Sequence, residues 1–398
     1  MQDFVHLHVH TQYSLLDGQA SVARLVDKAM QNGMKGIAVT DHGNMFGIKE
    51  FTNYVNKKNS GPKGEIKELK KRLVGIEAGS IECEDKEAEV AACKAKIVEA
   101  ENKLFKPIIG CEMYVARRTM DLKEGKQDQS GYHLIVLAKN ETGYHNLIKL
   151  VSHAWTRGYY MRPRTDRSEL EKYHEGLMVC SACLGGEIPK RITNDQCYPL
   201  QVKVNKYLME YSKKFNVKLV CTNDVHFVDE ENAEAHDRLI CLSTGKDLDD
   251  PTRMLYTKQE WMKTREEMNE LFADVPEALS NTLELLDKVE YYSIDHAPIM
   301  PTFAIPEDFG TEEEYRQKFT EKDLYDEFTQ DEHGNVVLSE EDGKAKIKRL
   351  GGYDKLYRIK LEGDYLAKLA FDGAKRIYGE PLTEEVKERM NFELYIMK

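Results

Sequence analysis

The chain has 398 residues, of which 41% are hydrophobic and 32% are charged, and its formal net charge is -12. This length predicts one large domain with an additional region. The negative charge argues against a generally basic nucleic-acid-binding surface, although bound cations would still allow a polyanionic substrate. The chain has no apolar run near the roughly eighteen residues of a membrane helix and no signal-peptide pattern, so we expect a cytoplasmic protein. Its 8 cysteines are spread along the chain, which predicts free thiols rather than disulfides.

The stretch over residues 4–18, FVHLHVHTQYSLLDG, alternates histidines with aliphatic residues. A period of two is typical of a strand, so His6, His8 and His10 are expected on one face. Imidazoles on a half-buried face need polar partners, and a metal ion is the commonest one. Asp17 follows a polar turn and could bring a carboxylate to the same place. A strand end with solvated histidines is the alternative interpretation.

The next segments predict alternating helices and strands. Helical spacing predicts a helix over 21–32 that ends at Gly33, then a strand over 36–40 and a helix over 45–56. This alternation is typical of an α/β fold. It breaks over 57–105, where two charged segments with narrow apolar stripes predict an inserted antiparallel helical hairpin. Its role is open between a solvated spacer and a partner-binding arm.

After this insertion the α/β pattern resumes. Strands are predicted over 107–116, 133–138, 177–181 and 218–222, and helices over 141–156, 200–215, 229–242 and 261–289. About seven strand–helix units predict a closed barrel or a long doubly wound sheet. We favour the barrel, because no glycine-rich dinucleotide motif follows any strand.

The composition changes beyond residue 291. Pro298, Pro301 and Pro306 predict an extended linker. The rest of this region predicts helices over 311–329, 361–378 and 383–395, and a polar loop or short hairpin over 331–344. We expect this region to form little core of its own and to be the beginning of something larger.

Side chains that bind transition metals recur near the predicted strands. In parallel α/β folds the functional site lies at the carboxyl ends of the strands. A set drawn from nearly every strand would bury several polar groups without partners unless the groups met each other. The set contains His8, His10, His42, Glu112, His133, Cys183, Asp224 and His226. Asp41 is expected to orient a ligand or cap a helix, and His6 to support the ligands or lie in the core.

These residues resemble the ligand motifs of the PHP (polymerase and histidinol phosphatase) family. The motifs are HVHT at 8–11, TDH at 40–42, GCE at 110–112, His133, Cys183 and DVH at 224–226. More closely, FVHLHVHTQYSLLDG, TDHGN, YHLIVLAKN, SACLGGEI and TNDVHFV are similar to the N-terminal part of the bacterial DNA polymerase III alpha-subunit family. The resemblance covers nearly the whole chain and weakens over 57–105 and 329–352.

The resemblance implies a distorted seven-stranded, TIM-like β/α barrel over 1–290 with a mostly helical C-terminal extension. It implies that 291–398 is a linker and the start of a polymerase region, ending before the catalytic palm carboxylates. It also implies up to three divalent ions, with zinc or manganese preferred and magnesium as a further candidate. The implied ligands, through which the site would act, are His8, His10, Asp17, His42, Glu112, His133, Cys183, Asp224 and His226.

The function that the resemblance implies is metal-dependent 3′–5′ proofreading cleavage at a DNA primer end. The full-length protein would be a DNA-directed DNA polymerase, a nucleotidyltransferase with sliding-clamp and proofreading-subunit partners. From the residues themselves, Tyr159, Tyr160, Arg162 and Arg164 in RGYYMRPRT are candidates to contact phosphate or stack on a terminal base, or else form a solvated loop. Two other functions stay open: a histidinol-phosphatase-like phosphoesterase, and a non-enzymatic docking domain with structural metals.

Overall fold

The computed structural model describes residues 1–81, 83, 85–193, 201–296, 298–299, 303–331 and 334–397. The chain divides into two compact units, Met1–His296 and Ala297–Lys398. Among the described residues, no helix is long and apolar enough to cross a membrane. The cysteines in these ranges are free thiols, as predicted, and Cys197 lies outside them.

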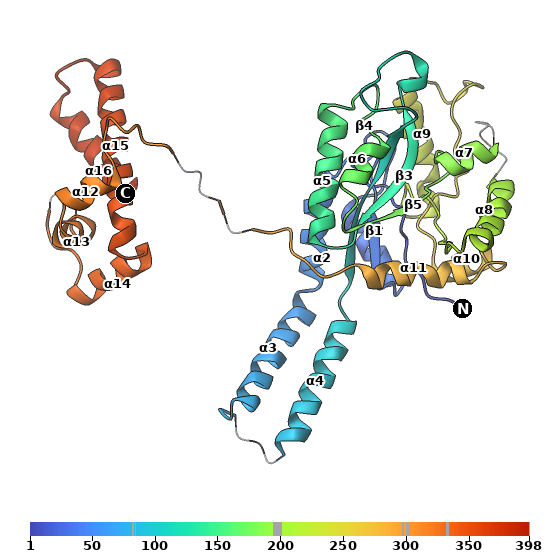
Figure 1. Cartoon of the computed structure of the whole chain (residues 1–398), viewed down its shortest axis with the longest axis horizontal. Helices are drawn as coiled ribbons and strands as arrows, with labels where there is room; N and C mark the ends of the chain where they lie inside the picture. Colours follow the sequence, from blue (N-terminus) through green and yellow to red (C-terminus); the bar gives the residue numbers. More distant parts are fainter. Residues whose placement is uncertain are drawn as a thin grey trace. The chain divides into compact units, whose positions relative to one another are not determined.

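The first unit contains a small mixed sheet (Figure 1). Its strands are β1 (Gly36–Val39), β2 (Lys106–Ala116), β3 (Gly131–Ala138), β4 (Arg164–Thr165) and β5 (Leu177–Cys180). The order is β1-β2-β3-β5, and β4 pairs with β2. The β1–β2 and β2–β4 pairs are parallel, whereas β3 runs antiparallel to both β2 and β5. The expectation of a parallel arrangement is therefore wrong for β3.

The histidine-rich segment over residues 5–10 is extended and lies between β1 and residues 224–226. On one side it accepts backbone hydrogen bonds from Ala38 to His6 and from Thr40 to Val9, each 2.9 Å long. On the other side the backbones of His10 and Val225 bond at 2.7 Å. The segment pairs by isolated bridges rather than as a regular strand.

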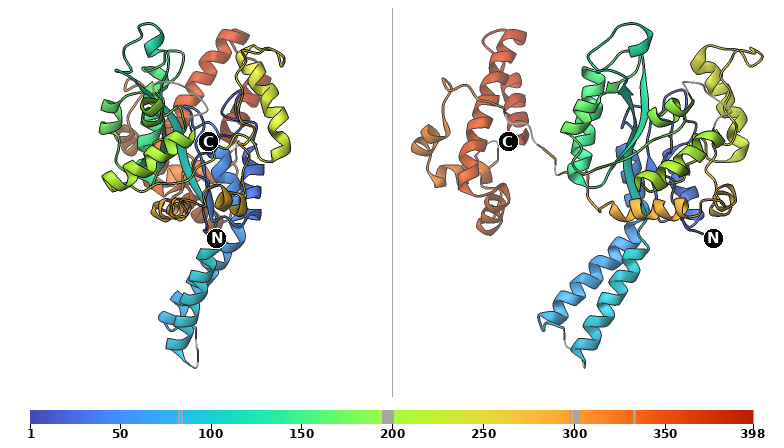
Figure 2. Two further views of the ribbon diagram at one scale, coloured as in Figure 1. Left: turned by 90° about the vertical axis from the view of Figure 1, so that its right-hand side faces the viewer. Right: turned by 45° about the vertical axis from the view of Figure 1, so that its right-hand side comes forward.

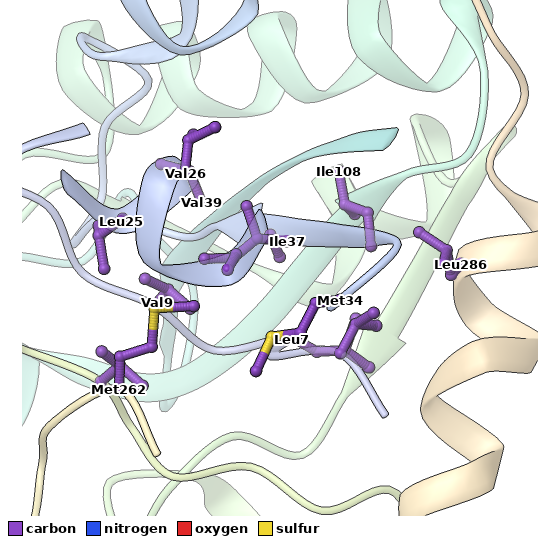
Figure 3. Close-up of a cluster of buried hydrophobic side chains, with 14 of the residues drawn as sticks. Leu7, Val9, Leu25, Val26, Met34, Ile37, Val39, Ile108, Met262 and Leu286 are labelled. Carbon is purple, nitrogen blue, oxygen red and sulfur yellow. The ribbon is translucent and has the colours of Figure 1, made fainter. Parts of the chain in front are cut away.

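The alternation of this segment positions the core. Val5, Leu7 and Val9 are fully buried in the principal hydrophobic cluster. Figure 3 shows Leu7 and Val9 close to Ile37 of β1, among aliphatic side chains from several elements. The histidines point to the opposite face, as a period of two requires.

Helices pack around the sheet in the same unit. They are α1 (Val22–Gln31), α2 (Ile48–Lys58), α5 (Glu141–Thr156), α6 (Arg167–Lys172), α7 (Glu187–Thr193), α8 (Gln201–Phe215), α9 (Ala233–Thr244), α10 (Arg265–Leu271) and α11 (Glu277–Lys288). The unit also contains two 3-10 turns, η1 (Lys126–Asp128) and η2 (Glu230–Asn232). Ser21 caps α1 by accepting from Arg24, and Asn140 caps α5 by accepting from Gly143, so both helices begin where side-chain acceptors precede apolar periodicity.

Two predicted elements differ in the structure. Residues 218–222 form no regular strand, because the backbone N–H of Cys221 bonds to the carbonyl of Ala278 instead of to a neighbouring strand. The segment predicted as one helix over 261–289 contains the separate helices α10 and α11. The predicted helix over 200–215 is present as α8, and residue 200 lies outside the described residues.

The insertion contains α3 (Ser60–Glu77) and α4 (Lys86–Asn102), which pack against each other and extend away from the sheet (Figures 1 and 2). At their base, buried Asn59 donates to the Phe105 carbonyl at 2.7 Å and accepts from the Phe105 N–H at 3.0 Å. One side chain therefore fixes the two ends of the insertion beside each other. Residues 82 and 84 of the connector lie outside the described residues.

The second unit is helical and has its own core, which corrects the expectation that it would have little. Its helices are α12 (Glu312–Lys318), α13 (Glu321–Thr329), α14 (Glu340–Leu350), α15 (Tyr353–Tyr378) and α16 (Glu384–Met397). Leu324, Phe328 and Leu356 are among the residues buried in one cluster. The predicted helix over 311–329 is two helices, because Thr320 forms a second capping box after Phe319 adopts an extended conformation. Residues 332 and 333 of the predicted polar loop, and Pro301 of the linker, lie outside the described residues.

Candidate metal centre

Glu112 is the centre of the predicted ligand set. Its carboxylate is fully buried in the middle of β2. Oε1 lies 3.1 Å from His8 Nε2 and 2.9 Å from His133 Nδ1, and Oε2 lies 2.5 Å from His42 Nδ1. The Sγ of Cys183 is 3.8 Å from Oε1. Side chains from four separate segments therefore meet at one carboxylate.

Asp224 extends this cluster toward the histidine-rich segment. Its Oδ1 lies 3.0 Å from His8 Nε2, 3.3 Å from His10 Nε2 and 3.8 Å from His226 Nδ1. Asp224 has a φ of 50°, a left-handed conformation that is uncommon outside glycine and is enriched at functional sites. This backbone conformation accompanies a side chain that faces three histidines.

Asp17 extends the cluster in a further direction and has two partners that the sequence analysis missed. Its Oδ2 lies 2.9 Å from His42 Nε2, and its Oδ1 lies 3.9 Å from His226 Nε2. Buried His236 of α9 places Nε2 3.8 Å from Oδ1, and the Tyr256 hydroxyl donates to Oδ1 at 3.1 Å. All nine predicted ligands thus belong to one connected cluster, which His236 and Tyr256 border.

The sheet topology explains how His133 reaches this cluster from the start of its strand. Because β3 is antiparallel to β2, the beginning of β3 lies beside the later part of β2, with His133 opposite Tyr114. A Cβ on Gly185 would lie 2.8 Å from the His133 ring, so a glycine there leaves space for the imidazole. His133 therefore lies at the shared site as expected. It reaches the site through antiparallel pairing of β3 with β2, not from the carboxyl end of a parallel strand.

Hydrogen bonds behind two ligands fix their tautomers. The Asp224 carbonyl can only accept, so His226 Nδ1, 2.7 Å away, carries the proton and leaves Nε2 free. Ser14 donates to Asp41 at 2.8 Å, so its oxygen accepts from His10 Nδ1 at 3.0 Å. Asp41 therefore lies behind His10 and reaches it through Ser14.

His6 contacts none of these ligands through any described interaction. Its Nε2 donates to the Lys263 carbonyl at 2.9 Å, and its ring contacts Phe4. Burial lowers the pKa of His6 to about 4. His6 is thus a core histidine, which is the second of the two roles expected for it.

Burial and mutual repulsion keep His10 in the neutral form that binds metals. Desolvation, followed by the neighbouring charges of His42 and His226, lowers the pKa of His10 to about 3. Burial alone would raise the pKa of Glu112, but His133 and His42 hold it well below its usual range. An ionised carboxylate and a neutral imidazole are both suitable ligands for a divalent cation.

Unpaired buried atoms test whether these residues fit a metal. Five buried atoms in the cluster make no well-directed hydrogen bond, although three of them lie close to another ligand atom: His8 Nδ1, His42 Nδ1, Glu112 Oε2, Asp224 Oδ1 and His226 Nε2. Buried polar atoms are normally paired, so a concentration of them indicates a missing partner. Ligand atoms of three groups lie within 4.8 Å of one another: His10, His42 and His226; His8, His10 and Glu112; and Glu112, His133 and Cys183. Nitrogen, oxygen and sulfur donors so arranged fit divalent transition metals.

Three of the predicted ligands are partly exposed to solvent. The side chains of His8, His10 and Glu112 are 0–1% exposed, whereas that of Asp224 is 30% exposed. The side chains of Asp17 and His42 are 22% and 17% exposed. A substrate could therefore approach from the side of these partly exposed ligands, which a closed structural site would not allow.

The four candidate substrate contacts differ in their surroundings. Arg164 is fully buried and donates to the carbonyls of Gly158 and Met120, so it does not fit a role in phosphate binding. Tyr160 is partly buried and lies beside the Arg164 guanidinium. Tyr159 is 48% exposed and Arg162 is exposed, so these two side chains stay available.

Comparison with known proteins gives consistent matches. The PHP domain model matches residues 6–221. Similar curated proteins, all named DNA polymerase III subunit alpha, come from Borreliella burgdorferi (39% identical over 80% of this chain), Treponema pallidum (33% over 91%) and Campylobacter jejuni (30% over 100%). This chain spans 26%, 29% and 30% of the lengths of those relatives. The family match covers more than half of the sequence and includes most of the histidine, carboxylate and thiol cluster, and the chain belongs to the PHP domain family.

Proposed function

We propose that this chain is the N-terminal part of a replicative DNA polymerase alpha subunit, and that its cluster catalyses metal-dependent 3′–5′ cleavage of DNA. The relatives named DNA polymerase III subunit alpha support the first statement. In this proposal residues 1–290 are the PHP domain and 291–398 begin the polymerase region, whose catalytic carboxylates lie outside the chain. The full-length protein would act in the cytoplasm with DNA, a sliding clamp and a proofreading subunit.

The observation that carries the catalytic proposal is the convergence of all nine predicted ligands on one cluster, in which three of them are partly exposed to solvent. The ligands come from segments that are distant in sequence, and several of their buried atoms make no well-directed hydrogen bond. A cluster with partly exposed carboxylates and imidazoles can bind a phosphodiester as well as a cation. This combination supports catalysis more than a purely structural role.

The residues would have distinct tasks in this reaction. Divalent cations in such a cluster neutralise phosphate charge and favour formation of hydroxide at neutral pH. His8, His10 and Glu112 would hold zinc- or manganese-like ions from the buried side, up to three in all with the other ligands. Asp17, His42 and Asp224 would hold them from the side where the phosphodiester enters. Ser14 and Asp41 would keep the proton on His10 Nδ1, so that Nε2 stays free.

The proposal also includes closure of the sheet into a seven-stranded, TIM-like barrel. Residues 5–10 bond to both β1 and 224–226, and Phe227 pairs in parallel with Trp261. These three irregular segments extend the four-strand path of β1, β2, β3 and β5. A distorted barrel would account for bridges in place of continuous strand ladders.

The test combines metal analysis with an exonuclease assay on the 398-residue chain. Wild type should retain divalent metal and release nucleotides from a 3′-mismatched primer. His10→Ala and Asp224→Ala should lose both properties. His145→Ala is the matched control, because this surface histidine of α5 pairs with Glu141 and contacts no ligand through any described interaction.

Two results would contradict the catalytic proposal. Metal retention without nucleotide release, in zinc and in manganese, would leave a structural centre in a docking domain. Release of phosphate from histidinol phosphate, without release of nucleotides from DNA, would indicate a small-molecule phosphoesterase.

A further inference from the structure

Three exposed aromatic side chains lie in a row on the first unit, and two of them are stacked while the third is tilted by 37°. Phe46, Trp155 and Tyr159 are 57%, 41% and 48% exposed. The ring centroids of Phe46 and Trp155 are 6.1 Å apart, and those of Trp155 and Tyr159 are 5.6 Å apart with an interplanar angle of 19°. We call these three residues the aromatic platform. The near-parallel rings of Trp155 and Tyr159 present outer flat faces on which a planar ligand can stack, and the tilted Phe46 borders them.

The platform is fixed to the loop that carries a ligand of the cluster. Trp155 Nε1 donates to the carbonyl of Gly43 at 2.8 Å, and Gly43 directly follows His42. Gly43 has a φ of +60°, and a Cβ there would lie 2.6 Å from Pro163. The 159–163 loop therefore packs tightly on the His42 loop, and the position of the platform relative to the cluster is set by direct contacts.

An exposed arginine, Arg162, lies beside an aromatic ring that contacts two histidines of the cluster. The Arg162 guanidinium is 5.7 Å from the ring centroid of Tyr114. The Tyr114 ring in turn lies 6.2 Å from that of His42 and 5.1 Å from that of His133. Arg162 has no carboxylate partner among the described residues, whereas Arg157 in the same region is paired with Asp121 and Glu169. The unpaired guanidinium is a binding group for an anion such as phosphate.

We propose that the platform and Arg162 bind the unpaired nucleotides next to the 3′ end of single-stranded DNA. The bases stack on Trp155 and Tyr159, and the guanidinium of Arg162 binds the adjacent backbone phosphate. An unpaired base fits because its flat face is free, whereas bases inside a duplex stack on each other. This inference rests on the proposed function, because the bound strand is the one whose 3′ end would be cleaved at the cluster.

Tryptophan fluorescence tests the stacking directly. The chain has two tryptophans, so Trp261→Phe leaves Trp155 as the reporter. Oligodeoxythymidylate with a 3′-terminal phosphorothioate, which resists hydrolysis, should quench Trp155 emission. An abasic oligomer of equal length should bind without this quenching. Tyr159→Ala should weaken binding about tenfold, within the range for loss of one base–aromatic stack.

An aromatic residue on α8 provides the matched control. Tyr211 is 38% exposed, and its ring lies between those of Tyr207 and Phe215 in a second row, tilted by 44° to the first and edge-on to the second. Tyr211→Ala removes the same ring from that row and should leave DNA affinity unchanged. Equal weakening by Tyr211→Ala and Tyr159→Ala would overturn the assignment to the platform.

Salt dependence tests Arg162. Arg162→Ala should weaken binding and reduce the slope of log affinity against log salt by about 0.7, the value for one phosphate contact on a single strand. Arg162→Lys should restore most of that slope. An unchanged slope in Arg162→Ala would overturn this part of the proposal.

The readouts separate this inference from the proposed function. If the chain releases nucleotides but the platform variants change neither Trp155 emission nor DNA affinity, the proposed function stands and the assignment of the platform fails. Quenching of Trp155 by DNA in a chain that releases no nucleotides would support the platform and refute the exonuclease. An unresponsive Trp155 with wild-type affinity in Tyr159→Ala would overturn the platform as a DNA-binding surface.

Discussion

The metal cluster and the α3–α4 hairpin are both rich in charged or ionisable side chains, yet they use them in opposite ways. In the hairpin, Arg72 and Glu89 pair at 3.0 Å with side chains 54% and 41% exposed. In the cluster, His8 and Glu112 approach to 3.1 Å with side chains 0% and 1% exposed. Exposed pairs contribute little to stability, whereas buried charges are tolerated only with strong partners. The difference indicates that the hairpin charges serve solvation, and it agrees with the metal-binding role proposed for the cluster.

The largest expected effect is on metal affinity in Glu112→Gln. The substitution keeps the shape of the side chain but removes the charge that contacts His8, His42 and His133. We expect metal affinity to fall more than about a hundredfold, beyond the range for residues behind the ligands. Competition with a chromogenic chelator measures it. Unchanged metal affinity would mean that the Glu112 carboxylate does not bind the metal. The buried charges of the cluster would then differ from the hairpin charges in burial alone.

Ser14→Ala should have the next largest effect. Without the hydroxyl, His10 Nδ1 loses its acceptor and the link to Asp41 is broken. Loss of such an orienting contact typically lowers metal affinity about 10- to 100-fold. Ser280→Ala is the control, because its hydroxyl bonds within the exposed part of α11. Equal affinities in the two variants would show that the orientation of His10 does not depend on Ser14.

Asn59→Ala tests the base of the hairpin. It leaves the N–H and carbonyl of Phe105 without their partner in a buried place. We expect the free energy of unfolding to fall by about 1–3 kcal/mol, with no change in metal content. Urea denaturation with parallel metal analysis measures both. Loss of metal would show that the hairpin base and the cluster are coupled.

The smallest expected effect follows replacement of residues 60–102 by a short glycine–serine linker. Because Asn59 holds the two ends of the insertion together, a short linker can bridge them. Metal affinity should stay within about twofold of wild type, since a flexible linker closes the same gap. Titration of the metal-free protein measures it. A larger loss would assign the hairpin a part in forming the centre.

Much of this structure could be predicted from the sequence, because it depends on patterns among residues that are close together in the chain. The alternation in 5–10 requires Leu7 and Val9 to face the core and His8 and His10 to face the opposite side. The two hairpin helices follow from local spacing in the same way. The antiparallel direction of β3 depends on pairing between distant strands, so nothing near His133 revealed it.

The missed residues show the same limit. His236 lies on the buried face of α9 together with Ile240, so the one available signal was a histidine within an apolar stripe. Tyr256 lies in an irregular segment with no pattern at all. In the sequence, Arg164 was as good a candidate for phosphate binding as Arg162. In the structure it is buried, and its guanidinium donates to the carbonyls of Gly158 and Met120. Tertiary contacts decided each of these cases.

The backbone bonds of Val225 to His10 and to His8 join segments far apart in the chain, so they also bear on the order of folding during synthesis. Residues 5–10 leave the ribosome long before residues 224–226, so the histidine-rich segment must wait for its second neighbour and for Asp224. Contacts of such long sequence separation form late and slowly. During that interval the nascent chain exposes aliphatic and imidazole side chains that the finished domain buries, which makes this segment a natural place for chaperones to bind or for nascent chains to aggregate.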